Sequence, residues 1–365
     1  MKTTAILAAM LLAASALPAQ AQQTKILTAD KHNEYGLIYS LPVTAFSIEV
    51  TAVREVRKAG PYFQYAKKYM GTDKVVKDDA EIWTIESVKV RPYGAPDPAS
   101  RYLMQLKSGA TTFIGVAEDG MLLSINCNPR DAGEAGASVP APAEGERLTD
   151  REYLQYVDED FIASQSTAKQ AQMLAENLME IREAKIALTR GTAETMPSDG
   201  KQLELMLNSL RHQEAAMTAA FLGNITRERV VKTYSYVPSE DGREVLFRMS
   251  DFAGFVAADD YSGEPVYVGV KVTDRGELPV DSKGEAKKMP KDAVAYCVPG
   301  AAVISVSSKG KEYFSKEFEI AQLGVVFGLN PELFSDKKSP SYAVFDPCTG
   351  ALKEIGAVKD APSQE

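Results

Sequence analysis

The spacing of apolar residues along this chain changes twice, and these changes predict the order of its elements. Up to residue 128, apolar and polar residues alternate, which is typical of half-buried strands. Phe46, Ile48 and Val50, for example, should point to the same side of one strand. We expect this first β unit, residues 22–128, to contain strands at 35–41, 45–57, 81–91, 101–106, 112–117 and 121–127.

One short helix interrupts the first β unit. Pro61 suits the first turn of a helix and Gly71 suits its C-terminal end, so residues 62–70 are predicted to be helical. Aromatic residues at helical spacing more often belong to a core than to a ligand site, and we expect the side that they share to pack against the sheet. These residues are Tyr62, Tyr65 and Tyr69.

A helical period replaces the alternation over residues 149–223. The segment before it, residues 129–148, is rich in proline, glycine and alanine and indicates a linker. Thr149 or Asp150 can cap a first long helix, and residues 191–200 contain the glycine and proline that end it. We therefore predict two long antiparallel helices, joined by a short break.

Each of these helices carries an apolar stripe that we expect to be buried. The first stripe consists of Leu154, Val157, Phe161, Leu174, Leu178, Ile181 and Leu188, and the second of Leu203, Met206, Leu207, Leu210, Met217 and Phe221. An unpaired charge in a core costs several kcal/mol. Replacing Leu178 or Leu210 with Asp should therefore unfold the protein.

Alternation returns after the helices and predicts a second β unit, residues 224–358, followed by a tail, residues 359–365. Residues 238–242 should close a hairpin between two strands, and turns are also expected at 309–310 and 346–350. The strands are expected at 230–237, 244–249, 265–273, 293–298, 301–307, 313–320, 323–329, 342–345 and 352–355. The pattern as a whole predicts an α+β protein with two mainly antiparallel, sandwich-like or barrel-like β units and an inserted long antiparallel helical hairpin.

The first 21 residues have the pattern of an export signal. Lys2 precedes an apolar run over residues 5–17, and Ala19 and Ala21 are small residues at the two positions that a signal peptidase reads. This run is shorter than the about 20 residues that a membrane-spanning helix needs. We expect export with cleavage near Ala21, a location in the periplasm or on the outer surface, and no membrane span in the mature chain.

The net charge argues against one class of binding partner, and the cysteine count limits the possible disulfides. The formal net charge is −9, which argues against nucleic acid, because its phosphates favour clustered Lys and Arg. Cys127, Cys297 and Cys348 are odd in number, so at least one of them has no partner within the chain. Cys297 and Cys348 are the better-placed pair, since both lie at the ends of predicted strands in the second β unit.

The residues of familiar catalytic and metal sites are scarce. His32 and His212 are the only histidines, and we interpret His212 as solvated or locally paired. Residues 166–169 match the Ser-x-x-Lys of penicillin-recognising enzymes without its partner motifs, and we interpret them as helix surface. Asp259 and Asp260 are suitable Ca²⁺ ligands, although a solvated turn is the commoner arrangement. We assign no catalytic, cofactor-binding or metal-binding residue and expect no cofactor.

Several segments together resemble one known family. They are Gly60-Pro61-Tyr62-Phe63-Gln64-Tyr65-Ala66 through Tyr69-Met70-Gly71, the hairpin stretch 181–200, the stretch 213–223, Ala321-Gln322-Leu323-Gly324-Val325-Val326, and Asp346-Pro347-Cys348-Thr349-Gly350. This chain resembles, over nearly its whole mature length, an uncharacterised secreted family of Bacteroides-type bacteria, a domain of unknown function. The resemblance implies a location in the periplasm or at the outer surface of a two-membrane cell. It implies no activity and no site residue.

Three functions are compatible with these features. A β-rich frame that bears a helical hairpin favours a non-enzymatic exported binding or scaffold protein of the envelope, whose partner is another envelope protein or a glycan. Met173, Met179 and Leu205 lie off the stripes and are candidate contacts. One alternative is a hydrolase acting on glycans or peptidoglycan, which requires two facing carboxylates beside an aromatic platform. The other is a permanent subunit of an envelope or surface assembly.

Overall fold

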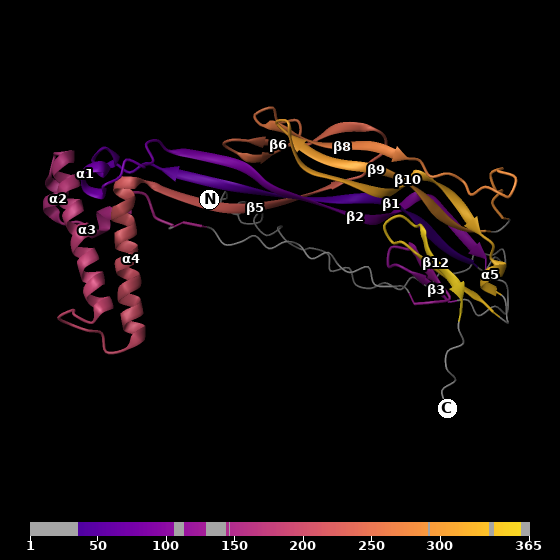
Figure 1. The fold of residues 1–365 in the computed structure, drawn as a ribbon, viewed down its shortest axis with the longest axis horizontal. Coiled ribbons are helices and arrows are strands. Elements are labelled where there is room, and N and C mark those ends of the chain that lie inside the picture. The colour runs from indigo at the N-terminus through magenta and orange to yellow at the C-terminus, as the bar shows by residue number, and fades with distance from the viewer. Residues whose placement is uncertain are drawn as a thin grey trace, which may run out of the picture.

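The protein is elongated, with the two long helices at one end and strands along the rest of its length (Figure 1). The computed structural model describes residues 36–105, 113–128, 144–145, 147–290, 293–335 and 339–358. The predicted fold class is confirmed: antiparallel sheets, part of which form a half-barrel, carry an antiparallel pair of long helices. The predicted export signal, His32 and the tail lie outside the described residues, as does most of the predicted linker.

The first sheet has three long strands in the order β2-β1-β5. They are β1 (Gly36–Lys58), β2 (Ala80–Gln105) and β5 (Asn224–Tyr236). The sequence predicts two strands where each of β1 and β2 is a single one, and that prediction is wrong. The predicted break in β2 is a bulge within one continuous strand. Ser40 of β1 stands opposite Arg101 and Pro42 stands opposite Pro96, so the residues of β2 between Pro96 and Arg101 form the bulge.

The second sheet has five strands in the order β10-β9-β8-β6-β7. They are β6 (Gly242–Ser250), β7 (Gly254–Val256), β8 (Glu264–Asp274), β9 (Val294–Ser308) and β10 (Lys311–Leu329). The turn at Lys309 and Gly310 is confirmed, and both residues have left-handed backbone, with φ of 50° and 76°. The sequence predicts two strands within each of β9 and β10, and that prediction is wrong, because the predicted break in β10 is a register shift between Ile320 and Val325. The hairpin predicted around residues 238–242 is also wrong, because β5 belongs to the first sheet and β6 to the second.

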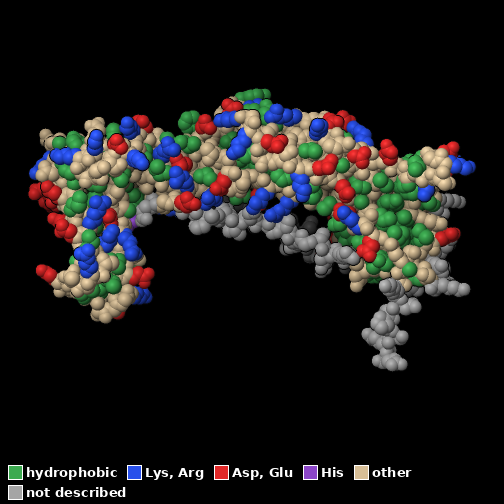
Figure 2. All heavy atoms as spheres, in the orientation of Figure 1, with side chains coloured by type: hydrophobic (Ala, Val, Ile, Leu, Met, Phe, Trp, Pro, Cys, Tyr) green, Lys and Arg blue, Asp and Glu red, His purple; other side chains and the backbone are tan. Residues whose placement is uncertain are grey.

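The third sheet lies at the end of the molecule opposite the helices (Figure 1). Its order is β12-β11-β4-β3, from β3 (Ile114–Val116), β4 (Leu122–Ile125), β11 (Ser341–Phe345) and β12 (Leu352–Ala357), and α5 (Glu332–Ser335) precedes β11. The predicted turn between β11 and β12 is confirmed, and Asp346 Oδ1 accepts hydrogen bonds from the backbone N–H groups of Cys348 and Thr349. Figure 2 shows hydrophobic side chains gathered on this end.

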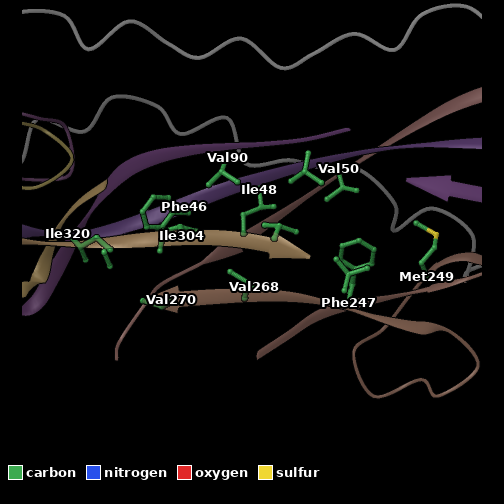
Figure 3. Close-up of a cluster of buried hydrophobic side chains, with 14 of the residues drawn as sticks. Phe46, Ile48, Val50, Val90, Phe247, Met249, Val268, Val270, Ile304 and Ile320 are labelled. Carbon is green, nitrogen blue, oxygen red and sulfur yellow. The ribbon is translucent and has the colours of Figure 1, made fainter. Parts of the chain in front are cut away.

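One apolar core joins the first two sheets. Phe46, Ile48 and Val50 of β1 are fully buried and point to one side, as predicted, where they meet side chains of β6, β8, β9 and β10 (Figure 3). Alternation along each strand supplies this face, because every second residue points inward. The core therefore contains residues of both predicted β units. The boundaries of those units stay predictions.

The helical end consists of two long helices and several short ones. The short ones are the 3₁₀ helices η1 (Phe63–Tyr65) and η2 (Glu152–Tyr156), α1 (Ala66–Met70) and α2 (Glu159–Ala163). The long helices are α3 (Thr167–Arg190) and α4 (Gly200–Leu222), whose antiparallel pairing is confirmed. They project across the long axis of the molecule (Figure 1).

The predicted start of the first long helix at residue 149 is wrong. Asp158 and Ser166 have extended backbone, and their side chains accept hydrogen bonds from the N–H groups of Phe161 and Lys169. Each therefore caps a new helix instead of continuing the previous one. The Ser-x-x-Lys sequence, residues 166–169, therefore lies at the start of α3, where Ser166 is the N-cap residue.

Candidate functional site

The base of the helical hairpin is tightly packed. Leu174 and Leu178 of α3 and Phe221 of α4 are fully buried there. The ring of Tyr62 contacts those of Tyr153, Phe161 and Phe221, with ring centroids 5.9, 6.3 and 6.0 Å apart. The prediction that the tyrosines of residues 62–70 belong to a core is confirmed, since Tyr62 is buried and Tyr65 and Tyr69 pack half-buried in the same cluster. The prediction that they pack against the sheet is wrong, because none of the described residues of this cluster lies in a strand.

The outer half of the hairpin is open. Leu203, Leu207 and Leu210 of the second stripe are only half-buried, and Met206 is 38% exposed. The prediction of a buried stripe is therefore wrong for the second stripe in this half, whereas Leu188 of the first stripe is buried there. It is also wrong for Leu154, which lies in η2 and is 40% exposed. The short elements η1, α1, η2 and α2 pack only on the base, and two helices alone cannot enclose a stripe between them.

An open groove follows the seam between α3 and α4. Two hollows of about 500 and 530 Å³ adjoin there and share Ala184 and Leu210 in their walls. We call them together the hairpin groove. Its other lining residues are Tyr156, Val157, Asp158, Asn177, Glu180, Ile181, Ala187, Leu188, Ala193, Glu194, Thr195, Met206, Ser209, Gln213 and Met217. From Asn177 to Leu188 it runs for about 17 Å, or three helical turns.

The charge of the hairpin groove is negative. Asp158, Glu180 and Glu194 line it, and no Lys, Arg or His does. Asp158 caps α2, accepting a hydrogen bond of 2.8 Å from Phe161, whereas Glu180 and Glu194 form no ion pair with any described residue. The groove therefore offers carboxylates that a basic partner can neutralise.

A neighbouring acid outside the groove is already neutralised. Glu214 of α4 accepts a hydrogen bond of 2.9 Å from Arg182 and another from Lys185, both on α3. Burial would raise the pKa of Glu214, but these bonds lower it below its usual range. The pair of cations thus ties the two helices together without changing the charge of the groove.

The one described histidine is locally paired, as predicted. His212 Nε2 contacts the Glu152 carboxylate, which also accepts hydrogen bonds from the backbone N–H and hydroxyl of Thr149. The Thr149 N–H and then His212 lower the pKa of Glu152. The interaction joins η2 to α4, so it fixes the base of the hairpin.

The remaining described residues of chemical interest form no site together. Cys297 and Cys348 are not bridged, although the Cys297 N–H donates a hydrogen bond of 3.0 Å to the carbonyl of Gly350, two residues from Cys348. Asp260 Oδ1 accepts a hydrogen bond of 2.9 Å from the N–H of Ser262 in a turn between β7 and β8. Cys127, Cys297 and Cys348 are free, and burial raises the pKa of the Cys297 thiol to about 11. Within the described residues, no group of three His, Cys, Asp or Glu side chains is placed to hold a metal ion.

The contact residues suggested by the sequence lie outside the groove. Leu205 and Met179 are 63% and 44% exposed, and Met173 is half-buried against the core of the base. The groove residues Ile181, Met206 and Leu210 were missed because they continue the apolar stripes. The sequence feature that indicates the groove is the pair Ala184 and Ala187, because their small side chains leave the seam between the two helices hollow.

The comparisons with known proteins place most of the chain in one family. A family model described as a domain of unknown function (DUF4831) matches residues 35–353. No curated protein and no solved structure matches the chain. Among the described residues, no helix combines the length and the apolar composition needed to cross a membrane.

Proposed function

We propose that this chain, which belongs to the DUF4831 family, is a non-enzymatic binding or scaffold protein of the bacterial envelope. The observation that supports this proposal is the open hairpin groove on a hairpin that projects from the β-rich body (Figure 1). Figure 2 shows hydrophobic side chains at the surface near the tip of this hairpin.

The proposed occupant of the hairpin groove is an amphipathic helix of another envelope protein. A seam between two helices that is open along one side accepts the apolar stripe of a third helix, which completes a three-helix arrangement. Glu180 and Glu194 lie beside the apolar floor without ion-pair partners in the described part of the chain. The partner helix should therefore carry Lys or Arg beside its apolar stripe.

A second copy of the same chain fits the groove less well. In a two-fold symmetric dimer each groove would face the other. Such a contact would bring Glu180 and Glu194 of both copies together without a basic residue in either lining. Like charges at a contact cost several kcal/mol, so charge favours a different, basic partner.

Two synthetic helices test this proposal directly. They share one apolar stripe and differ only in their flanking residues, which are Lys and Arg in one and Glu in the other. The basic helix should bind the full chain, and added salt should weaken the complex, because exposed charges are screened. A titration followed by fluorescence anisotropy of labelled helices measures this. Equal binding of both helices, or no binding, would refute the proposed occupant.

Two neighbouring exposed residues supply the matched variants. Met206 lines the groove and Leu205 does not, although both are exposed on α4. Met206→Arg should weaken binding of the basic helix by about 30-fold, the effect of losing an anchor worth about 2 kcal/mol. Leu205→Arg should change binding by less than about 2-fold. The Glu180→Gln, Glu194→Gln double variant should remove most of the salt dependence.

The location is a further part of the proposal. Lys2, the apolar run and Ala21 support export, and the resemblance to secreted proteins of Bacteroides-type bacteria supports the periplasm or outer surface. Protein isolated from the envelope fraction of such a cell should begin at Gln22 when its N-terminus is sequenced. Recovery from the cytoplasmic fraction with residues 1–21 attached would contradict this location.

A further inference from the structure

A second concave surface lies on the β-rich body, and none of its lining residues belongs to the hairpin. It is a groove of about 640 Å³ between the start of β2 and the ends of strands in the second sheet. Met249, Asp251 and Phe252 come from the end of β6 and the loop after it, and Lys309 from the turn between β9 and β10. We call it the strand-edge groove.

The lining of this groove shows which side of β2 it follows. All six successive residues from Ala80 to Ile85 contribute to its wall. Side chains of a strand alternate between the two faces of its sheet, so a hollow on one face would be lined by every second residue. A run of six successive residues therefore places the groove along the edge of β2, where the main chain itself is accessible.

This edge of β2 is unpaired within the described chain. The sheet order β2-β1-β5 puts β1 on one side of β2 and no described strand on the other. Residues 80–91 contain no proline, whereas Pro92, Pro96 and Pro98 follow further along the same strand. Proline protects a strand edge by removing a donor, and segment 80–85 has none, so its outward N–H and C=O groups pair with no described strand.

The side chains around this edge supply an apolar wall. Trp83, Met249 and Tyr313 line the groove half-buried or buried, and Phe252 is 81% exposed beside them. A pair of charges, Lys309 and Asp251, lies 3.8 Å apart in the same lining. A strand laid along β2 would thus have apolar surface on one side and solvent on the other.

We infer that the strand-edge groove binds an extended peptide segment of another protein, which adds a strand to β2 along residues 80–85. The free main-chain groups select an extended polypeptide, because only a strand presents donors and acceptors at the matching repeat. The apolar wall selects apolar side chains at alternate positions of that segment. This site is separate from the hairpin groove, so a scaffold with both could hold a helix and a strand at once.

The probe for this inference is a set of ten-residue synthetic peptides with alternating apolar and polar residues. Scrambled peptides of the same composition, which lose the alternation, are the controls. Trp83 is the only tryptophan of the chain, so a change in its fluorescence reports directly on the groove. Alternating peptides should change the emission and bind at least about 10-fold more tightly than scrambled ones.

Two isoleucines provide the edge variants, Ile82→Pro and Ile85→Pro, and Ile85 also packs half-buried against the core. Ile82 and Ile85 stand opposite Glu55 and Ala52 in an unbroken register, three residues apart. One of their N–H groups therefore points to β1 and the other points outward. Proline at the outward position should leave the hydrogen bonds between β1 and β2 intact and reduce peptide affinity at least about 10-fold, whereas proline at the other position should remove one of those bonds.

Amide hydrogen exchange of the unmodified chain gives an independent readout. Bound peptide should slow exchange at alternate residues within 80–85, because only the outward N–H groups gain partners. Three results would overturn the inference: equal binding of scrambled peptides, full affinity in the proline variant at the outward position, or no slowing of exchange. Pairing of two copies through this edge, seen as a proline-sensitive dimer, would also overturn it. Met206→Arg should leave peptide binding unchanged, which separates this test from that of the hairpin groove.

Discussion

Leu178→Asp is expected to unfold the helical end of the protein. Leu178 is fully buried in the cluster at the hairpin base, among residues such as Leu174 and Phe221. An unpaired charge in such a place costs about 3–5 kcal/mol, which is a large part of the about 5–15 kcal/mol that stabilises a typical fold. Circular dichroism should show the loss of the helical signal at a lower temperature than in the parent.

The neighbouring residue is the control for this prediction. Met179 is 44% exposed on the same helix, so Met179→Asp should change the free energy of unfolding by no more than about 0.5 kcal/mol. A parent-like melting curve for Leu178→Asp would contradict the packing described for the base. The structure also revises the expectation for Leu210→Asp, since Leu210 is half-buried in the wall of the hairpin groove. That variant should fold and lose affinity for the basic helix.

Gly60→Ala is expected to disturb the joint between the β-rich body and the hairpin. A Cβ atom at Gly60 would lie 2.4 Å from the carbonyl oxygen of Ala220 and 2.5 Å from that of Ala219, both in the last turn of α4. These are backbone atoms, so they cannot move aside as a flexible side chain would. The same turn accepts the N–H of Tyr62 in a hydrogen bond of 2.9 Å.

Overpacking of this kind costs about 1–3 kcal/mol, and thermal unfolding should show a corresponding drop in melting temperature for Gly60→Ala. Gly200→Ala is the matched control in the same hairpin, because nothing lies within 4 Å of a Cβ atom built there. Alanine favours helix over glycine, so that variant should be as stable as the parent or more stable, by up to about 1 kcal/mol. Equal melting temperatures for the two variants would contradict the close approach at Gly60.

Local chemistry explains which parts of the fold could be predicted. Phe46, Ile48 and Val50 alternate in the sequence, and that alternation alone places them on the buried face of β1. Gly71 ends α1 in the left-handed conformation, with φ of 69°, as its position after the predicted helix 62–70 indicates. The two long helices follow from their apolar period in the same way.

Tertiary contacts explain which parts could not be predicted. Alternation in β5 and β6 identifies two strands but not their partners, which lie in different sheets. The residues after Pro42 were predicted as a new strand, although the bulge opposite it keeps β1 continuous. The hairpin groove was missed for a similar reason. An apolar stripe such as Met206 and Leu210 does not show in the sequence whether another element covers it.

A position-specific crosslink tests the central claim, that the hairpin groove holds a partner helix in the envelope. A photoreactive amino acid is placed at Met206 in one variant and at Leu205 in another, and the full chain is irradiated in intact cells. Both residues are exposed on α4, but only Met206 lines the groove. The predicted result is one adduct of defined mass from position 206, crosslinked through a basic helical segment of the partner, and none from position 205. Equal adducts from both positions, or none from 206, would contradict the account.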